Sequence, residues 1–217
     1  MKIKIKPVLV KICGITIKED AIWAANLGAD FVGINLCPES PRKVSIEKAL
    51  EISSSLPSFV KTVGVFVNEE LAVIEKILKK VPLHVLQLHG NESPDVVTQF
   101  KNQFHLPIWK VVHIENEESL NKIADYVGIA DVILLDRFHP LLPGGTGEAF
   151  DWTIAVKAKE YGMRIILSGG LKPENVREAI SQVEPYAVDT ASGVEKEGHP
   201  RRKDIEKMKL FILGAKS

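Results

Sequence analysis

Short apolar segments alternate with segments of helical pattern eight times along this chain of 217 residues. Apolar runs rich in β-branched residues predict strands at 8–13, 30–36, 59–67, 83–88, 107–112, 131–135, 164–167 and 186–188. Predicted helices follow at 17–27, 46–55, 68–81, 93–104, 117–126, 151–161, from 173 onward, and 201–213. Such an alternation requires parallel strands. Eight units predict an α/β fold, a single-domain (β/α)8 TIM barrel over residues 1–217, with 1–7 as a short N-terminal extension.

The competing architecture is an open, doubly wound sheet with helices on both faces. Such sheets usually have fewer strands, and no G-x-G-x-x-G dinucleotide fingerprint follows the first predicted strand. A closed barrel is therefore favoured. Barrel enzymes keep their active sites at the C-terminal ends of the strands, so the residues that end each predicted strand are the first candidates for function.

The composition is that of a globular chain without a charge bias. Hydrophobic residues make up 45% of the chain and charged residues 26%, and 28 basic residues balance 28 acidic ones. This balance argues against bulk attraction to nucleic acid or to a membrane surface. No apolar run reaches the roughly 18 residues typical of a membrane-spanning helix. We therefore expect a small-molecule partner, with no nucleic acid and no membrane.

The two cysteines, Cys13 and Cys37, lack the C-x-x-C spacing of a redox or metal motif. Free thiols suit a reducing compartment. The first seven residues carry lysines but no continuous apolar segment, so they do not form a signal peptide. We therefore expect a cytoplasmic protein. The histidines show no metal-ligand spacing, so we expect no metal.

Two chemically active side chains stand at the ends of predicted strands. Cys13 ends the first strand, and Gly14 turns the chain toward a helix for which Thr16 and Glu19 have the spacing of a capping box. A lone cysteine at a strand end is most often a small buried apolar residue. Asp136 follows the sixth strand. In a barrel, this thiol and this carboxyl group face the same mouth from separate strands.

Two glycine-containing turns follow the last two predicted strands. Ser168, Gly169 and Gly170 come after the seventh strand, and Ser192 and Gly193 come after the eighth. Glycines in such places often form only tight turns. However, barrel enzymes frequently bind phosphate with these two loops, where exposed peptide N–H groups contact the anion. The two turns together predict a phosphate site.

These motifs resemble those of the phosphoribosylanthranilate isomerase family of tryptophan biosynthesis. The similarity runs almost from end to end of the chain. The segments that carry it are VKICGIT (10–16), FVGINLCPESPR (31–42), VGVFVN (63–68), VLQLHG (85–90), ILLD (133–136), GGTGEAFDW (144–152), LSGGLKPENV (167–176) and AVDTASGVE (187–195). Any one of them could occur by chance, whereas their shared order and spacing are specific.

The resemblance implies roles for individual residues. It implies that Cys13 is the general base and Asp136 the general acid of an Amadori rearrangement of N-(5-phosphoribosyl)anthranilate. It also implies that Arg42 contacts the carboxylate of the anthranilate. The residues that it assigns to the phosphate are Gly169, Gly170, Ser192 and Gly193. This reaction needs one acid and one base around the bound sugar, and no metal or redox cofactor.

Three further expectations concern the surroundings of this site. His89 ends the fourth predicted strand, where it either lines the sugar pocket or is a structural histidine. Lys11 shares the face of Cys13, and because the first and last strands of a barrel are neighbours, we expect it to pair with Asp189. The glycines within residues 143–147 suggest a lid over the site.

The acid and base roles also set requirements on two pKa values. An ordinary thiol has a pKa of about 8.5, so a base at Cys13 is expected to have a lowered pKa. An acid must hold its proton, so the pKa of Asp136 is expected to be raised by burial or by a nearby negative charge.

Two other functions stay open at this point. A related phosphosugar barrel enzyme, such as indole-glycerol-phosphate synthase, would use a lysine and a glutamate at the strand ends, where this chain has Cys13 and Asp136. A non-catalytic phosphometabolite-binding barrel would bind its ligand without turnover. The fold alone does not decide between them, because barrels support many chemistries. The oligomeric state, monomer or homodimer, is also open.

Overall fold

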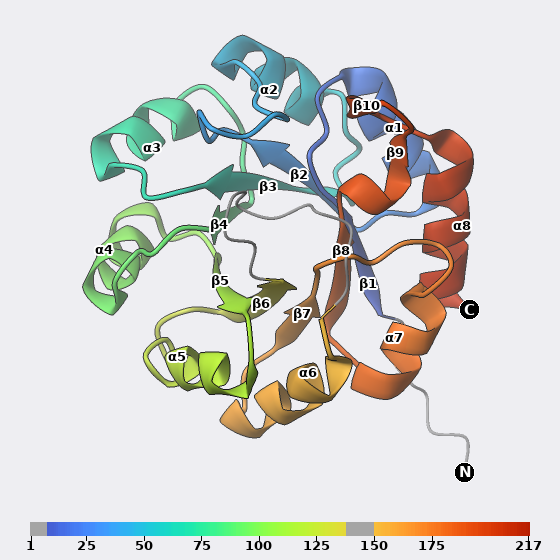
Figure 1. Cartoon of the computed structure of the whole chain (residues 1–217). Helices are drawn as coiled ribbons and strands as arrows, with labels where there is room; N and C mark the ends of the chain where they lie inside the picture. The colour runs from blue at the N-terminus through green and yellow to red at the C-terminus, as the bar shows by residue number, and fades with distance from the viewer. Residues whose placement is uncertain (1–7, 138–149) are drawn as a thin grey trace.

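Eight parallel strands close into a barrel in which β1 pairs with both β2 and β8 (Figure 1). The computed structural model describes residues 8–137 and 150–217. The strands are β1 (Leu9–Ile12), β2 (Phe31–Asn35), β3 (Lys61–Phe66), β4 (Val85–Leu88), β5 (Ile108–Ile114), β6 (Val132–Arg137), β7 (Ile165–Leu167) and β8 (Ala187–Thr190). This barrel confirms the predicted fold class. The expected extension at 1–7 and the expected lid at 143–147 lie outside the described residues.

A ring of helices surrounds the barrel (Figure 1). The helices are α1 (Lys18–Leu27), α2 (Ile46–Ser54), α3 (Leu71–Leu78), α4 (Pro94–Phe104), α5 (Asn121–Ala124), α6 (Trp152–Ala158), α7 (Val176–Val183) and α8 (Ile205–Lys216). The described residues also contain the 3₁₀ turns η1 (Glu117–Leu120), η2 (Lys159–Tyr161) and η3 (Ser192–Val194). Within the described residues, no helix is both long and apolar enough to cross a bilayer.

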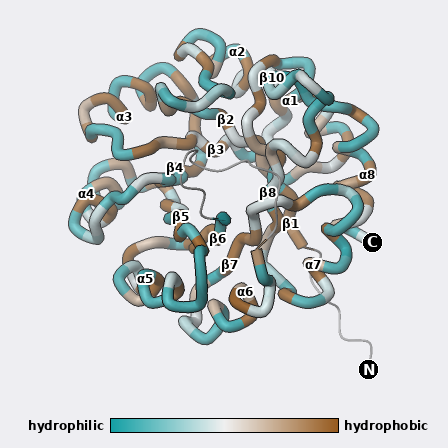
Figure 2. The backbone as a smooth tube through the Cα atoms, viewed as in Figure 1, coloured by the Kyte–Doolittle hydropathy of each residue, from teal (hydrophilic) through white to brown (hydrophobic). Residues whose placement is uncertain are grey.

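Each strand is buried on both faces, because one face lines the barrel and the other packs against the helices. The side chains that fill the barrel are Phe31, Val63, Val85, Trp109, Val111, Val132, Leu134, Ile166 and Ala187. The residues between them form a larger core with the helices. In Figure 2, hydrophobic stretches follow strands such as β1 and β7, whereas the helices alternate between the two colours. This two-sided burial explains why the strands have continuous apolar sequences.

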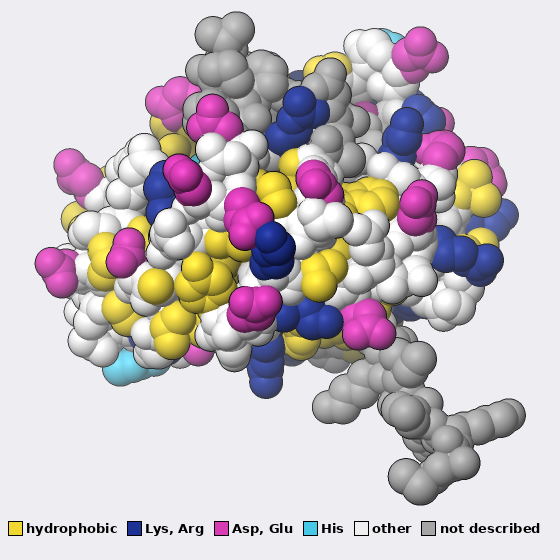
Figure 3. Space-filling view, turned by 60° about the horizontal axis from the view of Figure 1, so that its bottom comes forward, with side chains coloured by type: hydrophobic (Ala, Val, Ile, Leu, Met, Phe, Trp, Pro, Cys, Tyr) yellow, Lys and Arg dark blue, Asp and Glu magenta, His cyan; other side chains and the backbone are white. Residues whose placement is uncertain are grey.

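The outer surface mixes charges of both signs. On the face shown in Figure 3, basic and acidic side chains alternate, with hydrophobic side chains between them. The exposed large hydrophobic residues of the described chain are Ile22, Trp23, Leu50, Phe59, Val127, Val156, Leu210 and Leu213. No large field of one sign covers the face in view, in keeping with the balanced composition.

Several helix ends lie where the sequence predicts them. Ser45 accepts a hydrogen bond from the Lys48 N–H at the start of α2, and Ser93 accepts one from the Val96 N–H at the start of α4. Gly28 ends α1 in the left-handed conformation, with φ of 102°. At these three helix ends the local sequence and the structure agree.

The predicted cap of one helix and the predicted start of another, at residue 68, are wrong. Thr16 does not cap α1; its hydroxyl group instead donates to the carbonyl oxygen of Arg201. Asn68 does not cap α3, which begins at Leu71; the Asn68 side-chain oxygen accepts the Asn91 N–H at 2.7 Å. In both cases a segment distant in sequence takes the hydrogen-bonding group that local spacing assigns to the helix.

A two-stranded hairpin replaces the start of the last predicted helix. The sequence predicts a helix over 201–213, but β9 (Glu195–Lys196) and β10 (His199–Lys203) pair antiparallel before α8 begins. A tertiary contact holds the end of the hairpin, because the Lys203 N–H donates to Asp20 Oδ2 at 2.8 Å. The pattern of residues within a short stretch of sequence does not reveal such a contact. The hairpin brings charged side chains to the mouth of the barrel.

The predicted ion pair between the first and last strands is confirmed. Lys11 and Asp189 are partners in the register of β1 and β8, and Lys11 Nζ lies 3.0 Å from Asp189 Oδ1. The Lys11 side chain is fully buried. An ammonium ion inside a barrel is tolerated only beside such a partner. The pair therefore favours the one register in which the barrel closes.

Replacing Lys11 with methionine will leave the Asp189 carboxylate buried without its partner. We expect the free energy of unfolding to fall by about 3–5 kcal/mol, the range for breaking a buried ion pair. Urea denaturation followed by circular dichroism measures this loss. The double variant Lys11→Met, Asp189→Leu will lose less than the single variant, because no lone charge stays buried. A double variant as unstable as the sum of the two single variants contradicts this account.

Candidate active site

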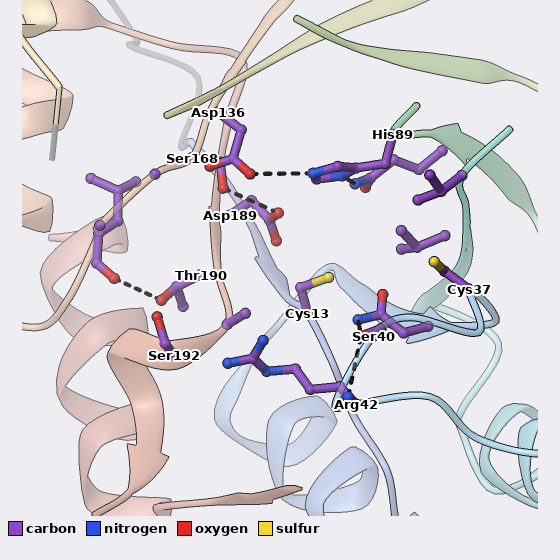
Figure 4. Close-up of a pocket in the computed structure, with 18 residues that line it drawn as sticks. Cys13, Cys37, Ser40, Arg42, His89, Asp136, Ser168, Asp189, Thr190 and Ser192 are labelled. Atoms are coloured by element: carbon purple, nitrogen blue, oxygen red, sulfur yellow. Dashed lines mark hydrogen bonds and ion pairs between the residues drawn. The ribbon is translucent and has the colours of Figure 1, made fainter. Parts of the chain in front are cut away.

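A cavity opens at the C-terminal ends of the strands (Figure 4). The predicted site residues that line it are Cys13, Arg42, His89, Asp136, Gly169, Gly170 and Ser192. Gly193 is not among the lining residues. It packs behind the cavity wall, where an added Cβ would collide with the Leu171 carbonyl oxygen. The barrel thus gathers residues from both ends of the chain, which the sequence separates widely.

Cys13 directly follows β1 and faces the cavity, with 7% of its surface exposed. Its thiol packs against Gly33 of β2, where an added Cβ would lie 2.7 Å from Sγ. Burial raises the pKa of the Cys13 thiol, and the Lys11 ammonium opposes this shift without cancelling it. The expected lowering of this pKa is therefore wrong, because the loss of hydration outweighs the nearby positive charge.

Asp136 lies in β6 and is almost fully buried. Its Oδ1 accepts the Arg137 N–H at 2.9 Å, and its Oδ2 lies 3.3 Å from His89 Nε2. Burial raises the pKa of Asp136, but the contacts with His89, the charge of His113 and the Arg137 N–H together lower it below its ordinary value. The expected raising is therefore wrong, and this carboxyl group is ionised at neutral pH.

Gln87 and His113 surround His89, and the sequence alone does not single out either residue. Gln87 lines the cavity, and its Nε2 lies 3.0 Å from His89 Nδ1. The rings of His89 and His113 have centroids 5.1 Å apart, and burial lowers the pKa of His113. Gln87 is a polar residue two positions before His89 in an apolar strand. That spacing, which places both side chains on one face, is the signal that identifies Gln87.

Arg42 is held by a carboxylate of the hairpin. Its Nε and Nη2 donate to Glu195 Oε1 and Oε2 at 2.6 and 2.9 Å, which makes a bidentate pair. Lys203 Nζ lies 3.2 Å from the same Oε1. Figure 4 shows the guanidinium group between Cys13 and Ser192. The pairing depends on the β9–β10 hairpin, so the sequence pattern alone does not reveal it.

The loops after β7 and β8 form one wall of the cavity. Gly169 and Gly170 have φ of 76° and 74°, in the left-handed region that favours glycine. A Cβ on Gly169 would lie 2.7 Å from Arg137 N, so the close approach also needs glycine. Thr190 Oγ1 donates to the Leu171 carbonyl oxygen at 2.7 Å and joins the two loops. Their backbone is therefore held close together beside the cavity.

A buried thiol, a buried carboxyl group and an arginine share one cavity at the mouth of a closed barrel. The fold and the site define a (β/α)8 barrel enzyme that is equipped for acid–base chemistry on an anionic substrate. Residues 10–213 match the family model described as N-(5'phosphoribosyl)anthranilate (PRA) isomerase. The chain belongs to this family.

Individual relatives agree with the family match. The chain is 44% identical over 207 residues to the N-(5'-phosphoribosyl)anthranilate isomerase of Trichlorobacter lovleyi, a match that covers 95% of this chain and 97% of that protein. The crystal structure of phosphoribosyl anthranilate isomerase from Thermotoga maritima is 42% identical, with a TM-score of 0.88 and coverage of 96% and 98%. These matches support an isomerase rather than a synthase or a non-catalytic barrel.

A further solved structure of the family carries a ligand. It is a phosphoribosyl anthranilate isomerase in complex with reduced 1-(O-carboxyphenylamino)-1-deoxyribulose 5-phosphate. This chain is 41% identical to it, with a TM-score of 0.85 and coverage of 96% of this chain and 98% of that one.

The pH at which Cys13 reacts with iodoacetamide will report the ionisation of its thiol. Because burial raises this pKa, we expect the midpoint of alkylation above about 8.5, the value of an exposed thiol. Lys11→Met removes the opposing positive charge and will move the midpoint further up, whereas Lys11→Arg will move it less. Mass spectrometry of the Cys13 peptide in a Cys37→Ser background measures the rates. A midpoint that moves down in Lys11→Met contradicts the role given to this charge.

Proposed function

We propose that Cys13 is the general base and Asp136 the general acid with which this isomerase converts N-(5'-phosphoribosyl)anthranilate into 1-(2-carboxyphenylamino)-1-deoxyribulose 5-phosphate. The observation that carries the proposal is a buried thiol after β1 and a buried carboxyl group in β6 that face one cavity. The reaction is an Amadori rearrangement, in which an N-aryl aminoaldose becomes an aminoketose. It consists of proton transfers, which side chains perform without a cofactor.

One proton transfer opens the sugar ring, and a second one moves the double bond that the opening creates. The acid protonates the ring oxygen while the bond from C1′ to that oxygen breaks, and the nitrogen lone pair forms the C1′–N double bond of a Schiff base. The base then removes the proton on C2′, the electron pair left behind forms a C1′–C2′ double bond, and the π electrons of the C1′–N double bond return to nitrogen. The resulting enolamine takes up a proton at C1′ and loses the proton of its C2′ hydroxyl group, which gives the ketone.

The acid step requires a proton on Asp136, which is ionised in the free enzyme. The substrate carries a phosphate and a carboxylate, and their negative charge raises the pKa of Asp136 when they enter the cavity. His89 Nε2 lies 3.3 Å from Asp136 Oδ2, close enough to pass a proton to it. Substrate binding therefore prepares the acid that the first step consumes.

The base step requires a thiolate on Cys13. The ammonium group of Lys11 approaches this side chain from within the barrel and favours the ionised form against burial. Gly33 leaves the space in which the thiol sits, and the same glycine faces Cε of Lys11. Only a fraction of the thiol is ionised at neutral pH, but that fraction is the reactive form and faces the cavity.

The anionic ends of the substrate bind at two places in this proposal. Arg42 binds the anthranilate carboxylate with the three N–H donors that Glu195 does not occupy, since a guanidinium group has five. His89 lines the sugar pocket. The phosphate binds at the loops after β7 and β8, with the backbone of Gly169, Gly170, Ser192 and Gly193. The ligand complex of a 41% identical relative supports an anionic ligand in this family.

The proposal extends to the setting of the protein. Its partner is a small phosphorylated molecule, neither nucleic acid nor membrane, and its compartment is the cytoplasm, which suits the free thiols of Cys13 and Cys37. The whole chain, 1–217, is one domain and acts as a monomer or a homodimer. One solved structure of a relative from Thermotoga maritima is of monomers generated from a dimeric phosphoribosylanthranilate isomerase. Size-exclusion chromatography with light scattering measures the state of this chain.

Replacing Cys13 with serine or Asp136 with asparagine will each lower kcat by about 10²–10⁴-fold, the usual contribution of a general acid or base. The assay is turnover of freshly generated phosphoribosylanthranilate, with circular dichroism to confirm folding. Cys37→Ser, which changes the second thiol of the same cavity, will keep most of the activity. Wild-type turnover in the asparagine variant removes Asp136 from the role of acid.

Replacing Glu195 with glutamine will loosen Arg42, because one charge-assisted hydrogen bond of the bidentate pair is lost. We expect KM to rise about tenfold, equivalent to about 1.4 kcal/mol, with a smaller change in kcat. Glu197→Gln is the matched control, since Glu197 lies exposed on the same hairpin. A lower KM in Glu195→Gln indicates that Glu195 competes with the substrate for Arg42 and contradicts the positioning role.

A further inference from the structure

Three side chains of metal-ligating type meet on adjacent strands at the mouth of the barrel. His89 follows β4, His113 lies in β5 and Asp136 lies in β6. His113 and Asp136 are register partners. His113 lies on the same face of β5 as Trp109 and Val111, and the side chains of these two residues fill the barrel. The sequence separations of these three residues match no metal motif, so only the fold brings them together.

The separations of the three groups fit a single bound cation. One potential ligand atom from each residue lies within 4.8 Å of the others. His89 Nε2 and Asp136 Oδ2 are 3.3 Å apart. Two ligands of a tetrahedral zinc ion, each bound at about 2.0–2.2 Å, are separated by about 3.3–3.5 Å. One edge of the coordination tetrahedron is therefore already in place.

Two of the three side chains are oriented by hydrogen bonds at the atoms that would not bind the metal. His113 Nε2 lies 3.2 Å from the His89 carbonyl oxygen, and because a carbonyl only accepts, this nitrogen carries the proton and leaves Nδ1 with a lone pair. Asp136 Oδ1 accepts the Arg137 N–H, and Oδ2 faces His89 Nε2 at 3.3 Å. Histidine and carboxylate ligands of metals are normally oriented in this way, by a hydrogen bond at the atom that does not bind the metal.

The third side chain has a matching partner. Gln87 Oε1 is buried and without a hydrogen-bond partner among the described residues, and His89 Nε2 is buried against Asp136 Oδ2 at 3.3 Å. The Gln87 amide nitrogen faces His89 Nδ1 at 3.0 Å. If the amide turns over, Gln87 Oε1 accepts a hydrogen bond from the His89 Nδ1–H, and His89 Nε2 presents a lone pair. In this orientation His89 Nδ1 satisfies Gln87 Oε1, and a metal would satisfy the lone pair of His89 Nε2.

We propose that His89, His113 and Asp136 form a binding site for a divalent transition metal of the Zn²⁺ type. Two imidazole nitrogens and one carboxylate oxygen are ligands that Zn²⁺ accepts readily, whereas Mg²⁺ prefers oxygen ligands alone. The fourth ligand position belongs to water in the cavity. Bound zinc inhibits the enzyme, because the metal occupies the Asp136 carboxylate that must carry a proton. This consequence rests on the proposed role of Asp136 as the acid.

Titration calorimetry of the full chain with zinc sulfate tests the site without using activity. Wild type will bind one Zn²⁺ at this site, and His113→Gln will bind it at least about tenfold more weakly, since even changes to groups that only orient ligands cost 10–100-fold. Glutamine keeps an N–H for the His89 carbonyl but has no counterpart of Nδ1. His84→Gln is the matched control, because His84 precedes β4 at the opposite end of the barrel and contacts Thr62.

Two results overturn the site. One is equal zinc affinity in wild type and His113→Gln. The other is a cobalt-loaded protein whose absorption shows thiolate-to-metal charge transfer, which would place the metal on Cys13 or Cys37. We expect a spectrum without this band, because nitrogen and oxygen ligands alone give no thiolate-to-metal charge transfer. Mg²⁺ at the same concentration will not displace cobalt.

A separate inhibition assay distinguishes the metal site from the catalytic proposal. Zinc will inhibit turnover by wild type and His84→Gln, and His113→Gln will resist it by at least about tenfold in concentration. Zinc that binds in calorimetry but leaves turnover unchanged supports the metal site and contradicts the acid role of Asp136. Zinc that inhibits wild type and His113→Gln equally contradicts the metal site.

Discussion

The ion pair between Lys11 and Asp189 is the contact on which the mouth of the barrel depends. It joins the first strand to the last at a fixed register, deep enough that Lys11 has no exposed surface. Two residues beyond Lys11 the chain reaches Cys13, and beyond Asp189 it reaches the loop with Ser192. The height of the thiol relative to the phosphate loops therefore follows from the register at which the barrel closes. Gly33 completes the arrangement, because a larger residue there would push into the thiol.

Opposite charges also occur together around the rest of the mouth. Arg42 and Lys203 share the carboxylate of Glu195, and Asp136 lies against His89. These arrangements explain why the two pKa values run against the simple expectation. For Cys13, burial decides because Asp189 offsets the positive charge of Lys11. For Asp136, the contacts with His89 and the hydrogen bond from the Arg137 N–H outweigh burial. The bound substrate, with its own negative charges, then shifts the site toward catalysis.

The sequence predicts the parts of this structure that depend on local pattern and on the topology of a barrel. Alternating strands and helices predict the closed barrel, and strand neighbours in a barrel predict the pairing of Lys11 with Asp189. The parts that it misses depend on contacts distant in sequence. In the β9–β10 hairpin, β10 (His199–Lys203) has a polar sequence. A tertiary contact with Asp20 sets its strand conformation. Likewise, the position of His113 beside His89 follows only from the order of the strands, and the directions of the pKa shifts follow only from burial.

The central claim is that Cys13 and Asp136 act on the sugar from within one cavity. A crystal structure of this protein with the reduced product analogue tests it most directly. We predict Cys13 Sγ within about 3.5 Å of C2′, the distance at which bound groups react. We further predict a carboxylate oxygen of Asp136 near the oxygen that closes the ring, and the phosphate on the loops after β7 and β8. An analogue bound with C2′ far from Cys13, or with its phosphate at the Arg42 side of the cavity, would contradict the account.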